Sequence, residues 1–335
     1  MIKTIIVDDS PLVRDIIKDF LQSEGSFEII AEAEHGQDGV DKAKILDPDL
    51  ITMDFNMPVM DGLTAIEEIR KFSNCGIVMI STHDTAKMAY DATVKGAHDF
   101  FAKDIFTTNM SDRQRSDIFN TLKQITSIKK KAPLLKENIK DSSKAIQKIN
   151  CIVIASSTGG PMALCQLCSG LPENFPVPIL IVQHNTSGFD KGFVQWLDGY
   201  SKLSVTLAEK DIIPFKGHVY IAPTDKHLII GEKGIDFDDS DPINNQKPAA
   251  DILFKSASEK YKNAIISIVL TGMGDDGAAG TRYVKDAGGI TIAQDESSSM
   301  IYGMPEAAVK TGCIDMILPL NEIANKLVSL TSVGV

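Results

Sequence analysis

Acidic, hydroxyl and amine side chains follow four short apolar runs in the first third of the chain. They are Asp8, Asp9, Asp54, Ser81 and Lys103. Short runs rich in β-branched residues are typical of buried strands, and the carboxyl ends of parallel strands meet at one edge of a sheet. A single acid after a strand could simply cap the next helix. Five polar groups on four strand ends instead indicate a shared binding site.

Carboxylates held this close together repel one another, so the cluster requires a hard divalent cation. Carboxylate and carbonyl oxygens are the ligands that Mg²⁺ prefers. The predicted ligands are Asp8, Asp9, Asp54 and the backbone carbonyl of Asn56. With the cation bound, Asp54 could accept a phosphoryl group as a carboxylate nucleophile. Ser81 and Lys103 would then hydrogen-bond the phosphate oxygens.

A serine, a histidine and an acid occupy comparable positions in the second half of the chain. Ser157, His184 and Asp276 each follow an apolar run typical of a strand. Hydrolysis of an ester needs a nucleophile, a base that removes its proton and an acid that orients the base. These three residues could supply the three roles, and Ser157 suits the nucleophile because small residues surround it.

Glycines after the serine predict a sharp turn from a strand into a helix. Gly159 and Gly160 follow Ser157 much as in a nucleophile elbow. The N-terminus of that helix would favour a developing oxyanion. The backbone amide of Thr158 is the first predicted donor, and that of Met273, which lies between two glycines, is the second.

Spacing alone leaves other assignments open for this second group of residues. Ser156 competes with Ser157 as the hydroxyl, and Asp275 competes with Asp276 as the acid. Taken alone, His184 could be a core histidine with satisfied hydrogen bonds. A serine-glycine loop after a strand could also cradle a phosphate, as in a nucleotide-binding module. Both functions are compatible with the pattern at this point.

Strand-like and helix-like segments alternate along both halves of the chain. This alternation predicts two α/β domains, each with a parallel sheet covered by helices. We expect the domains at residues 1–122 and 150–335, joined by a lysine-rich linker at 123–149. Within the second domain, residues 219–222 and 228–231 are close enough in sequence to form a hairpin.

Composition favours a two-domain cytoplasmic protein. The chain has 335 residues, 43% of them hydrophobic and 24% charged, which suffices for two cores. Its net charge of −11 argues against general nucleic-acid binding, which requires a basic face. No apolar run reaches the length of a membrane span, and the first residues show no charged-then-apolar pattern, so we expect a cytoplasmic protein. Cys165 and Cys168 could suggest redox or metal chemistry, but their neighbours favour a half-buried helix.

The first 122 residues resemble the receiver domains of response regulators. The resemblance rests on Val7–Ser10, Asp54–Gly62, Ser81 and Lys103. It implies a flavodoxin-like (βα)5 fold in which Asp54 accepts phosphate from a histidine kinase and Mg²⁺ supports the transfer. Asp104 departs from the family, which usually has proline after the lysine.

The second half is similar to the catalytic domain of CheB-type protein-glutamate methylesterases. The matching segments are Ser156–Gly160, Gln183–His184, Tyr220–Pro223, Pro248–Phe254, Leu270–Gly277, Ala293–Ser297 and Tyr302–Pro305. The resemblance implies a doubly wound, mainly parallel sheet with Ser157, His184 and Asp276 in the catalytic roles. Ala155 and Ser156 depart from the Gly-Ala that the family commonly has, which adds bulk at the turn.

Together the two resemblances imply a phosphorylation-regulated serine hydrolase of sensory adaptation. Its substrates would be γ-glutamyl methyl esters, and certain glutamines, on chemotaxis receptors. Those receptors and a histidine kinase are the implied partners; nucleic acid, membrane insertion and a cofactor for ester hydrolysis are not expected. We expect a monomer. A transcriptional regulator is a further alternative, although the second half shows no basic recognition helix.

Overall fold

The computed structural model describes residues 1–82, 86–106, 110, 112–127, 148–185 and 188–332. The chain forms two compact units, Met1–Ala132 and Pro133–Val335, each with its own sheet and core. Most of the predicted linker at residues 123–149 lies outside the described residues. The domain boundaries drawn from the sequence therefore remain predictions.

A five-stranded parallel sheet forms the centre of the first unit. Its strands are β1 (Ile2–Val7), β2 (Phe27–Ala33), β3 (Leu50–Asp54), β4 (Gly76–Ser81) and β5 (Asp99–Ala102). They pair in the order β2-β1-β3-β4-β5, which confirms the flavodoxin-like fold. Because every pair is parallel, all five carboxyl ends lie at one edge of the sheet.

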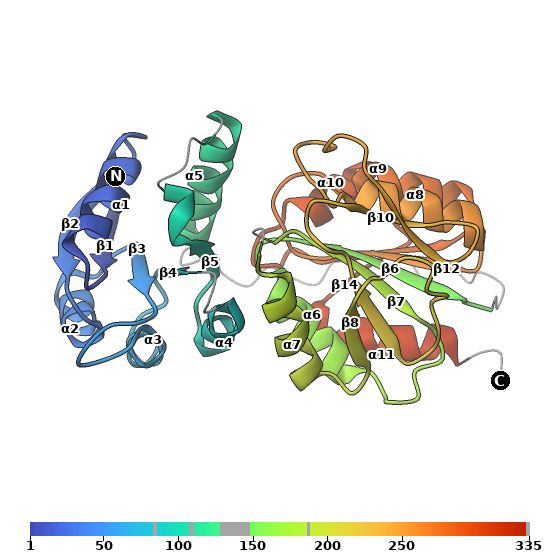
Figure 1. Ribbon diagram of the computed structural model, residues 1–335, viewed down its shortest axis with the longest axis horizontal. Coiled ribbons are helices and arrows are strands. Elements are labelled where there is room, and N and C mark those ends of the chain that lie inside the picture. The colour runs from blue at the N-terminus through green and yellow to red at the C-terminus, as the bar shows by residue number, and fades with distance from the viewer. Residues whose placement is uncertain (83–85, 107–109, 111, 128–147, 186–187, 333–335) are drawn as a thin grey trace. The chain divides into compact units, whose positions relative to one another are not determined.

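Helices cover both faces of this sheet, with α1 and α5 on one face and α2, α3 and α4 on the other (Figure 1). They are α1 (Pro11–Gln22), α2 (Gly36–Leu46), α3 (Gly62–Arg70), α4 (Ala86–Lys95), the 3₁₀ turn η2 (Lys103–Phe106) and α5 (Asp112–Ser127). Helix α1 begins as predicted, with Pro11 in its first turn and Ser10 Oγ accepting from the Val13 amide. Helix α5 continues to Ser127 and so includes the first residues of the segment predicted as a linker.

Seven parallel strands form the sheet of the second unit. They are β6 (Cys151–Ser156), β7 (Ile179–Gln183), β8 (Ser204–Leu207), β9 (His218–Ile221), β12 (Ile265–Val269), β13 (Ile290–Gln294) and β14 (Met316–Leu318). Their order is β14-β13-β12-β6-β7-β9-β8, so β7, β8 and β9 lie on one side of β6 and the later strands β12, β13 and β14 lie on the other. Such a reversal creates a crevice outside the carboxyl ends of the central strands, where ligands of doubly wound sheets bind.

Six helices cover the two faces of this larger sheet. Helices α6 (Gly160–Gly170), α7 (Asp190–Tyr200) and α11 (Leu320–Thr331) lie on one face. Helices α8 (Ala250–Tyr261), α9 (Ala278–Asp286) and α10 (Met304–Lys310) lie on the other (Figure 1). In the described part of the chain, no helix combines the length and the apolar character needed to cross a bilayer.

The predicted hairpin between residues 219–222 and 228–231 is wrong. Strand β9 lies between β7 and β8 in the large sheet and pairs in parallel with both. Because both of its edges are occupied, β10 (His227–Ile230) pairs with β11 (Ile235–Asp238) in a separate antiparallel ribbon. The turn of that ribbon contains Gly234 at φ 133°, a conformation that glycine adopts without strain.

Burial of Phe254 should be a main source of stability in the second unit, because this ring joins α8 to α9. Its side chain is 0% exposed, and a Cβ atom at Gly280 of α9 would lie 2.8 Å from its Cβ. We expect Phe254→Ala to lower the free energy of unfolding by about 3–5 kcal/mol. Ile213→Ala, at a site 73% exposed, should lower it by under about 0.5 kcal/mol. Urea unfolding followed by the fluorescence of Trp196, the single tryptophan, measures both; equal effects would contradict the prediction.

Candidate functional site

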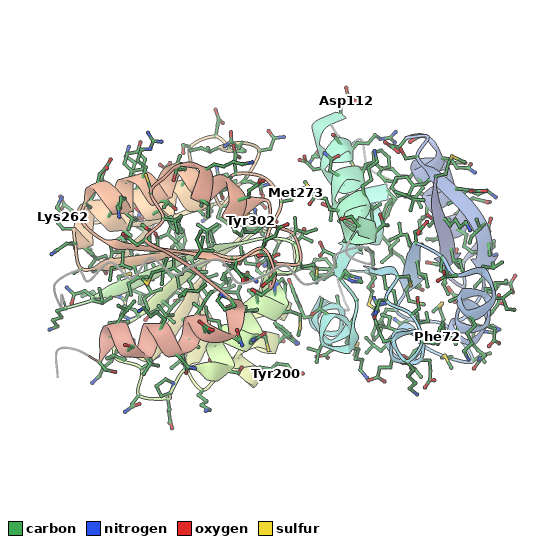
Figure 2. All side chains as sticks on the ribbon, turned by 180° about the vertical axis from the view of Figure 1, so that it is seen from behind. Phe72, Asp112, Tyr200, Lys262, Met273 and Tyr302 are labelled. Carbon is green, nitrogen blue, oxygen red and sulfur yellow. The ribbon has the colours of Figure 1, made fainter. Side chains whose placement is uncertain are left out.

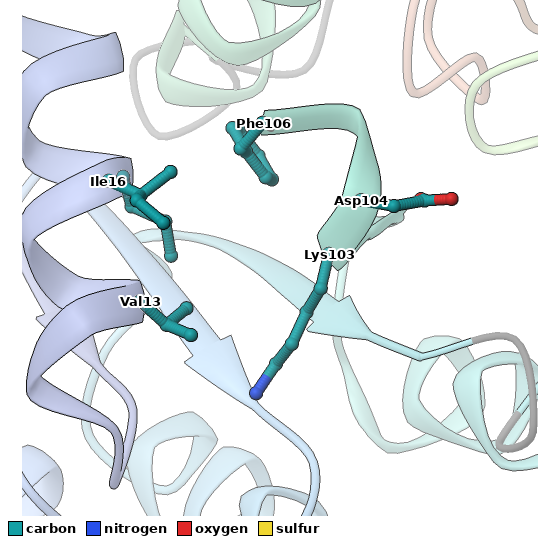
Figure 3. Close-up of a pocket in the computed structure, with 6 residues that line it drawn as sticks. Val13, Ile16, Lys103, Asp104 and Phe106 are labelled. Carbon is teal, nitrogen blue, oxygen red and sulfur yellow. The ribbon is translucent and has the colours of Figure 1, made fainter. Parts of the chain in front are cut away.

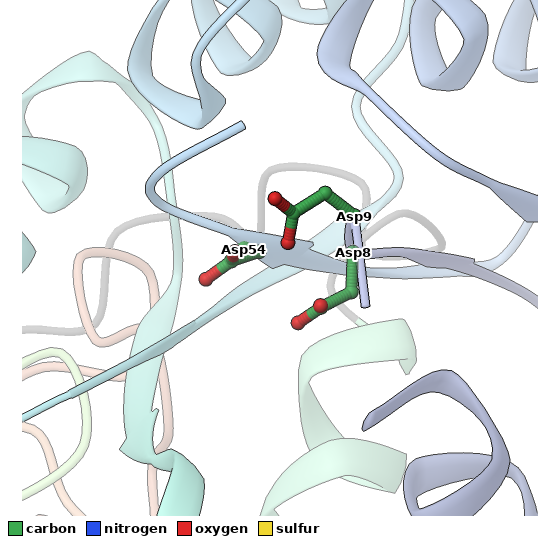
Figure 4. Close-up of side chains that lie close together, drawn as sticks. All are labelled: Asp8, Asp9 and Asp54. Atoms are coloured by element: carbon green, nitrogen blue, oxygen red, sulfur yellow. The ribbon is translucent and has the colours of Figure 1, made fainter. Parts of the chain in front are cut away.

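Three carboxylates lie together where β1 and β3 end in the first unit. One oxygen from each of Asp8, Asp9 and Asp54 lies within 4.8 Å of the others (Figure 4). Asp8 and Asp54 are buried, whereas Asp9 is exposed. The structure therefore brings together the three acids that the sequence predicts as cation ligands.

The amine of Lys103 bridges two of these acids. Its Nζ lies 2.9 Å from Asp8 Oδ2 and 2.8 Å from Asp54 Oδ1. Burial acts to lower the pKa of Lys103, but the two ion pairs outweigh it and raise that pKa. Burial also raises the pKa of Asp54 to about 6, with Lys103 opposing the shift and the charge of Asp8 adding to it. Positive charge at this edge therefore stabilises the ionised, nucleophilic form of Asp54.

For the other two predicted residues of this site, Ser81 and Asn56, the structure shows where the backbone lies. Ser81 is the last residue of β4 and pairs with Ala102 of β5, so its backbone lies at the same edge as Asp54. The side chain of Ser81 lies outside what the structure describes. Asn56 is exposed, two positions after Asp54 in the loop that follows β3. The roles of Ser81 and Asn56 thus stay predictions.

Asp104, which stands where receivers usually have proline, points away from the site. An apolar hollow of about 240 Å³ lies beside Lys103 (Figure 3). Its other lining residues are Val13, Ile16, Ile17, Asp104 and Phe106. The side chain of Asp104 is directed away from Val13 and Ile16, while Lys103 extends past the hollow toward Asp8 and Asp54. The departure from the family pattern therefore leaves the amine in position.

The donor set of this edge fits Mg²⁺. Three carboxylates with clustered oxygens supply hard ligands, and one of them is exposed enough for the cation to retain water. Asp8, Asp9 and Asp54 would hold the ion, with the carbonyl of Asn56 as the fourth predicted ligand. The bound ion would neutralise charge on an incoming phosphoryl group.

In the second unit, the register of β6 and β7 makes Ser157 and His184 neighbours. Ser156 lies opposite Gln183 in this parallel pair, and the His184 amide donates to the Ser156 carbonyl at 3.0 Å. Adjacent strands lie about 4.8 Å apart, so the next residues of each strand adjoin at the carboxyl edge. Ser156 is fully buried and its hydroxyl donates to Gln183, whereas Ser157 is partly exposed. The geometry therefore favours Ser157 as the reactive hydroxyl.

His184 is in direct contact with Asp276. The distance from Nε2 of the imidazole to Oδ2 of Asp276 is 2.8 Å. An ionised carboxylate only accepts hydrogen bonds, so Nε2 carries the proton and Nδ1 is left as an acceptor. Nδ1 is buried and has no hydrogen-bond partner among the described residues. Asp275 is exposed and faces Asn244 at 3.4 Å, so the structure separates the two competing acids.

The N-terminus of α8 holds the carboxylate of Asp276. Its Oδ2 accepts from the Ala250 amide at 2.7 Å, and its Oδ1 accepts from the amides of Asp251 and Gly277, both at 3.0 Å. Burial alone would raise the pKa of Asp276, but the bonds from His184 and from the helix amides outweigh it and lower that pKa. Asp276 therefore stays ionised beside the imidazole.

Asp251 is a site residue that the sequence pattern did not single out. Its Oδ1 accepts from the amides of Gly277 and Gly280 at 2.9 and 2.6 Å and so caps α9. Asp276 binds the start of α8 while Asp251, in the first turn of α8, binds the start of α9. The segment Pro248–Phe254 was part of the family resemblance, which is the only sequence signal that pointed here. Burial, reinforced by the charge of Asp276, raises the pKa of Asp251 to about 6.

The turn after β6 has the predicted shape. Gly159 adopts φ 75° at the start of α6, and a Cβ atom there would lie 2.7 Å from Met300 Cβ. The Thr158 amide donates to no other described residue, so it is available to an oxyanion. Met273 and Tyr302 lie on adjoining loops (Figure 2), which a β-bridge between Gly272 and Tyr302 joins.

The methyl group of Ala155, where the family commonly has glycine, lies beside Gly277, the N-cap residue of α9. A Cβ atom at Gly277 would lie 3.0 Å from Ala155 Cβ, and Gly277 also adopts φ 89°. The other departure, Ser156, forms the hydrogen bond with Gln183. Cys165 and Cys168 are buried in α6 as free thiols, and burial raises the pKa of Cys168 to about 12. A thiol that stays protonated at neutral pH is a poor redox or metal-binding group, because the thiolate is the reactive form.

The fold defines a response regulator with an α/β output domain, in which the predicted base His184 and the predicted acid Asp276 are in contact. The receiver domain family of response regulators matches residues 4–114, and the CheB methylesterase family matches residues 152–327. The chain belongs to the CheB methylesterase family. Both resemblances seen in the sequence are confirmed.

Relatives of this architecture extend over nearly the whole chain. Two proteins named protein-glutamate methylesterase/protein-glutamine glutaminase, from Thermotoga maritima and Archaeoglobus fulgidus, are each 36% identical to it. The first match covers 98% of both chains, and the second covers 99% of this chain and 98% of the relative. The crystal structure of the Thermotoga maritima CheB methylesterase catalytic domain is 41% identical, with a TM-score of 0.54, and covers 55% of this chain and 100% of that one.

Replacing Asp251 by asparagine should change how stability varies with pH. Because the pKa of Asp251 is raised from 3.8 to about 6, the native state binds this proton more tightly than the unfolded chain. Its contribution to stability is therefore lost as pH rises through this range. Asparagine retains an acceptor for the α9 amides without the charge. Between about pH 4 and pH 7, Asp251→Asn should gain on the order of 2 kcal/mol relative to wild type.

Urea unfolding at several pH values, followed by Trp196 fluorescence, measures this difference. Asp275→Asn is the matched control, because it removes a nearby charge from an exposed position. A stability difference between Asp251→Asn and wild type that stays constant with pH would contradict the prediction.

Proposed function

We propose that this chain hydrolyses γ-glutamyl methyl esters on chemotaxis receptors under the control of phosphorylation at Asp54. The hydrolase assignment rests on the 2.8 Å contact between His184 and Asp276 at the sheet edge where Ser157 follows its strand. The substrate class rests on the relatives, which are named protein-glutamate methylesterase/protein-glutamine glutaminase.

Acylation would begin with attack of Ser157 Oγ on the ester carbonyl while Nδ1 of His184 takes the hydroxyl proton. Asp276 keeps the proton on Nε2 and stabilises the imidazolium that forms. The amides of Thr158 and Met273 would hydrogen-bond the oxyanion. His184 then returns the proton to the leaving oxygen, and methanol departs.

Deacylation would use the same groups in reverse. His184 removes a proton from water, the hydroxide attacks the acyl-serine, and Ser157 recovers its proton as the glutamate carboxylate leaves. A glutamine side chain would follow the same route with ammonia as the leaving group. This supports glutaminase activity as the second proposed reaction.

Control by the receiver would act through charge at Asp54. The phosphodonor is proposed to be a histidine kinase, and Mg²⁺ at Asp8, Asp9 and Asp54 would support the transfer by neutralising phosphate charge. Lys103 would leave its ion pair with Asp54 to contact the new phosphate oxygens, together with Ser81. The phosphoryl group adds about −1.5 to −2 charges to the edge of the sheet. A cytoplasmic, monomeric protein remains the prediction from the sequence.

Loss of the nucleophile should abolish ester hydrolysis, whereas loss of the acid should slow it. Ser157→Ala should release no methanol from methylated receptor membranes, because no acyl-enzyme can form. Asp276→Asn should lower turnover by a factor on the order of 10⁴, because asparagine does not hold the imidazole in the required tautomer. Asp275→Asn is the control and should retain near-normal turnover. A loss under about tenfold for Asp276→Asn would count against its role as the acid.

Asp54→Asn should abolish the response to a phosphodonor. With Mg²⁺ and a radiolabelled small-molecule acyl phosphate, the wild-type chain should incorporate one phosphoryl group and change its rate of methanol release. The asparagine variant lacks the nucleophilic oxygen and should do neither. Asp61→Asn, at the N-cap of α3 in the same unit, should still be labelled. Label retained on Asp54→Asn, or incorporation that survives chelation of Mg²⁺, would contradict this assignment.

A further inference from the structure

One buried side chain is hydrogen-bonded to the backbones of both predicted catalytic residues. Gln183 is the last residue of β7 and is 2% exposed. Its Nε2 donates to the carbonyl oxygen of Ser157 at 3.0 Å and to that of His184 at 2.9 Å. The side-chain amide therefore connects the turn that carries the serine to the strand end that carries the histidine.

The neighbours of Gln183 distinguish the two ends of its amide. The carbonyl oxygens of Ser157 and His184 only accept, so they face Nε2 and leave Oε1 toward the Ser156 hydroxyl, which donates to it at 2.7 Å. Gly160 permits the close approach, because a Cβ atom there would lie 2.0 Å from Oε1. Since the resembling family commonly has alanine at this serine position, the hydroxyl is an additional constraint in this chain.

Loss of the Gln183 side-chain amide would affect the turn after β6 and the end of β7 to different extents. The Ser157 carbonyl also accepts from the Gly160 amide at 2.7 Å, so the turn after β6 keeps an anchor of its own. What disappears is the side-chain link between the Ser157 and His184 carbonyls, while the backbone bond from the His184 amide to the Ser156 carbonyl remains. Displacing a reacting group by about 1 Å can cost on the order of 10² in rate, so the spacing between hydroxyl and imidazole is sensitive to this link.

We propose that Gln183 is a positioning residue that sets the spacing between the Ser157 hydroxyl and the His184 imidazole, with the Ser156 hydroxyl holding its amide oxygen. The inference rests on the proposed roles of Ser157 and His184 as nucleophile and base. Gln183 acts through the backbone of both residues and not by contact with substrate or with the reacting atoms.

The test measures how fast a fluorophosphonate reagent labels Ser157 in the full-length chain, with the product identified by mass spectrometry. In this reaction an Oγ–P bond forms, the P–F bond breaks and fluoride leaves, while the hydroxyl proton passes to His184. Gln183→Met fills the same volume without hydrogen bonds. It should slow labelling about 100-fold when His184 is present. In the His184→Ala background, where there is no base to position, it should change the slow residual rate by less than about twofold.

Two further variants separate positioning from general loss of structure. Thr291→Val removes the buried hydroxyl bonded to the Cys313 carbonyl at 2.6 Å, in a strand of the same sheet, and should lower the melting temperature without slowing labelling. Ser156→Ala introduces the residue common in the family and should slow labelling less than Gln183→Met, again only when His184 is present. This second cycle tests the inference even if Gln183→Met does not fold.

Equal slowing by Gln183→Met in both backgrounds, or no slowing in either, would overturn the positioning role; if that variant does not fold, the same outcomes for Ser156→Ala overturn it. Failure of the proposed function has a different signature. If Ser157→Ala still releases methanol from receptor membranes, or if His184→Ala labels as fast as wild type, the catalytic assignment itself is wrong.

Discussion

A carboxylate can be buried beside an imidazole only where hydrogen-bond donors replace its water, and the N-terminus of α8 supplies them to Asp276. The side chain is 3% exposed and accepts from the amides of Ala250 and Asp251 as well as from His184. Burial opposes ionisation, and these donors overcome it. The tautomer and direction of the imidazole therefore depend on where one helix begins.

The two units stabilise carboxylates at their sheet edges by different groups. In both, a parallel sheet gathers polar side chains at the carboxyl ends of its strands. The receiver edge concentrates three acids, and the amine of Lys103 forms ion pairs with two of them. The corresponding edge of the second unit has no comparable amine among its described contacts, and backbone amides at the starts of α8 and α9 instead stabilise Asp276 and Asp251.

Local patterns in the sequence predicted most of the elements and the polar residues that follow the strands. They failed at the hairpin expected between residues 219–222 and 228–231, because nearness in sequence does not reveal that both edges of β9 are occupied. They also passed over Asp251 and Gln183. An acid in the first turn of a helix and a glutamine at a strand end are common, and nothing local distinguishes the ones that bond to distant loops.

The sequence by itself determined the order of strands and helices and the kinds of side chain at the strand ends, because periodicity and turn residues act over a few positions. Only the tertiary structure decided that Ser157 is partly exposed while Ser156 is buried, and that Asp276 rather than Asp275 contacts His184. Those choices depend on register and burial, which bring together groups 92 positions apart in the chain. The two residues of each pair, Ser156 and Ser157 or Asp275 and Asp276, have the same side chain and differ only in the direction that the folded backbone gives it.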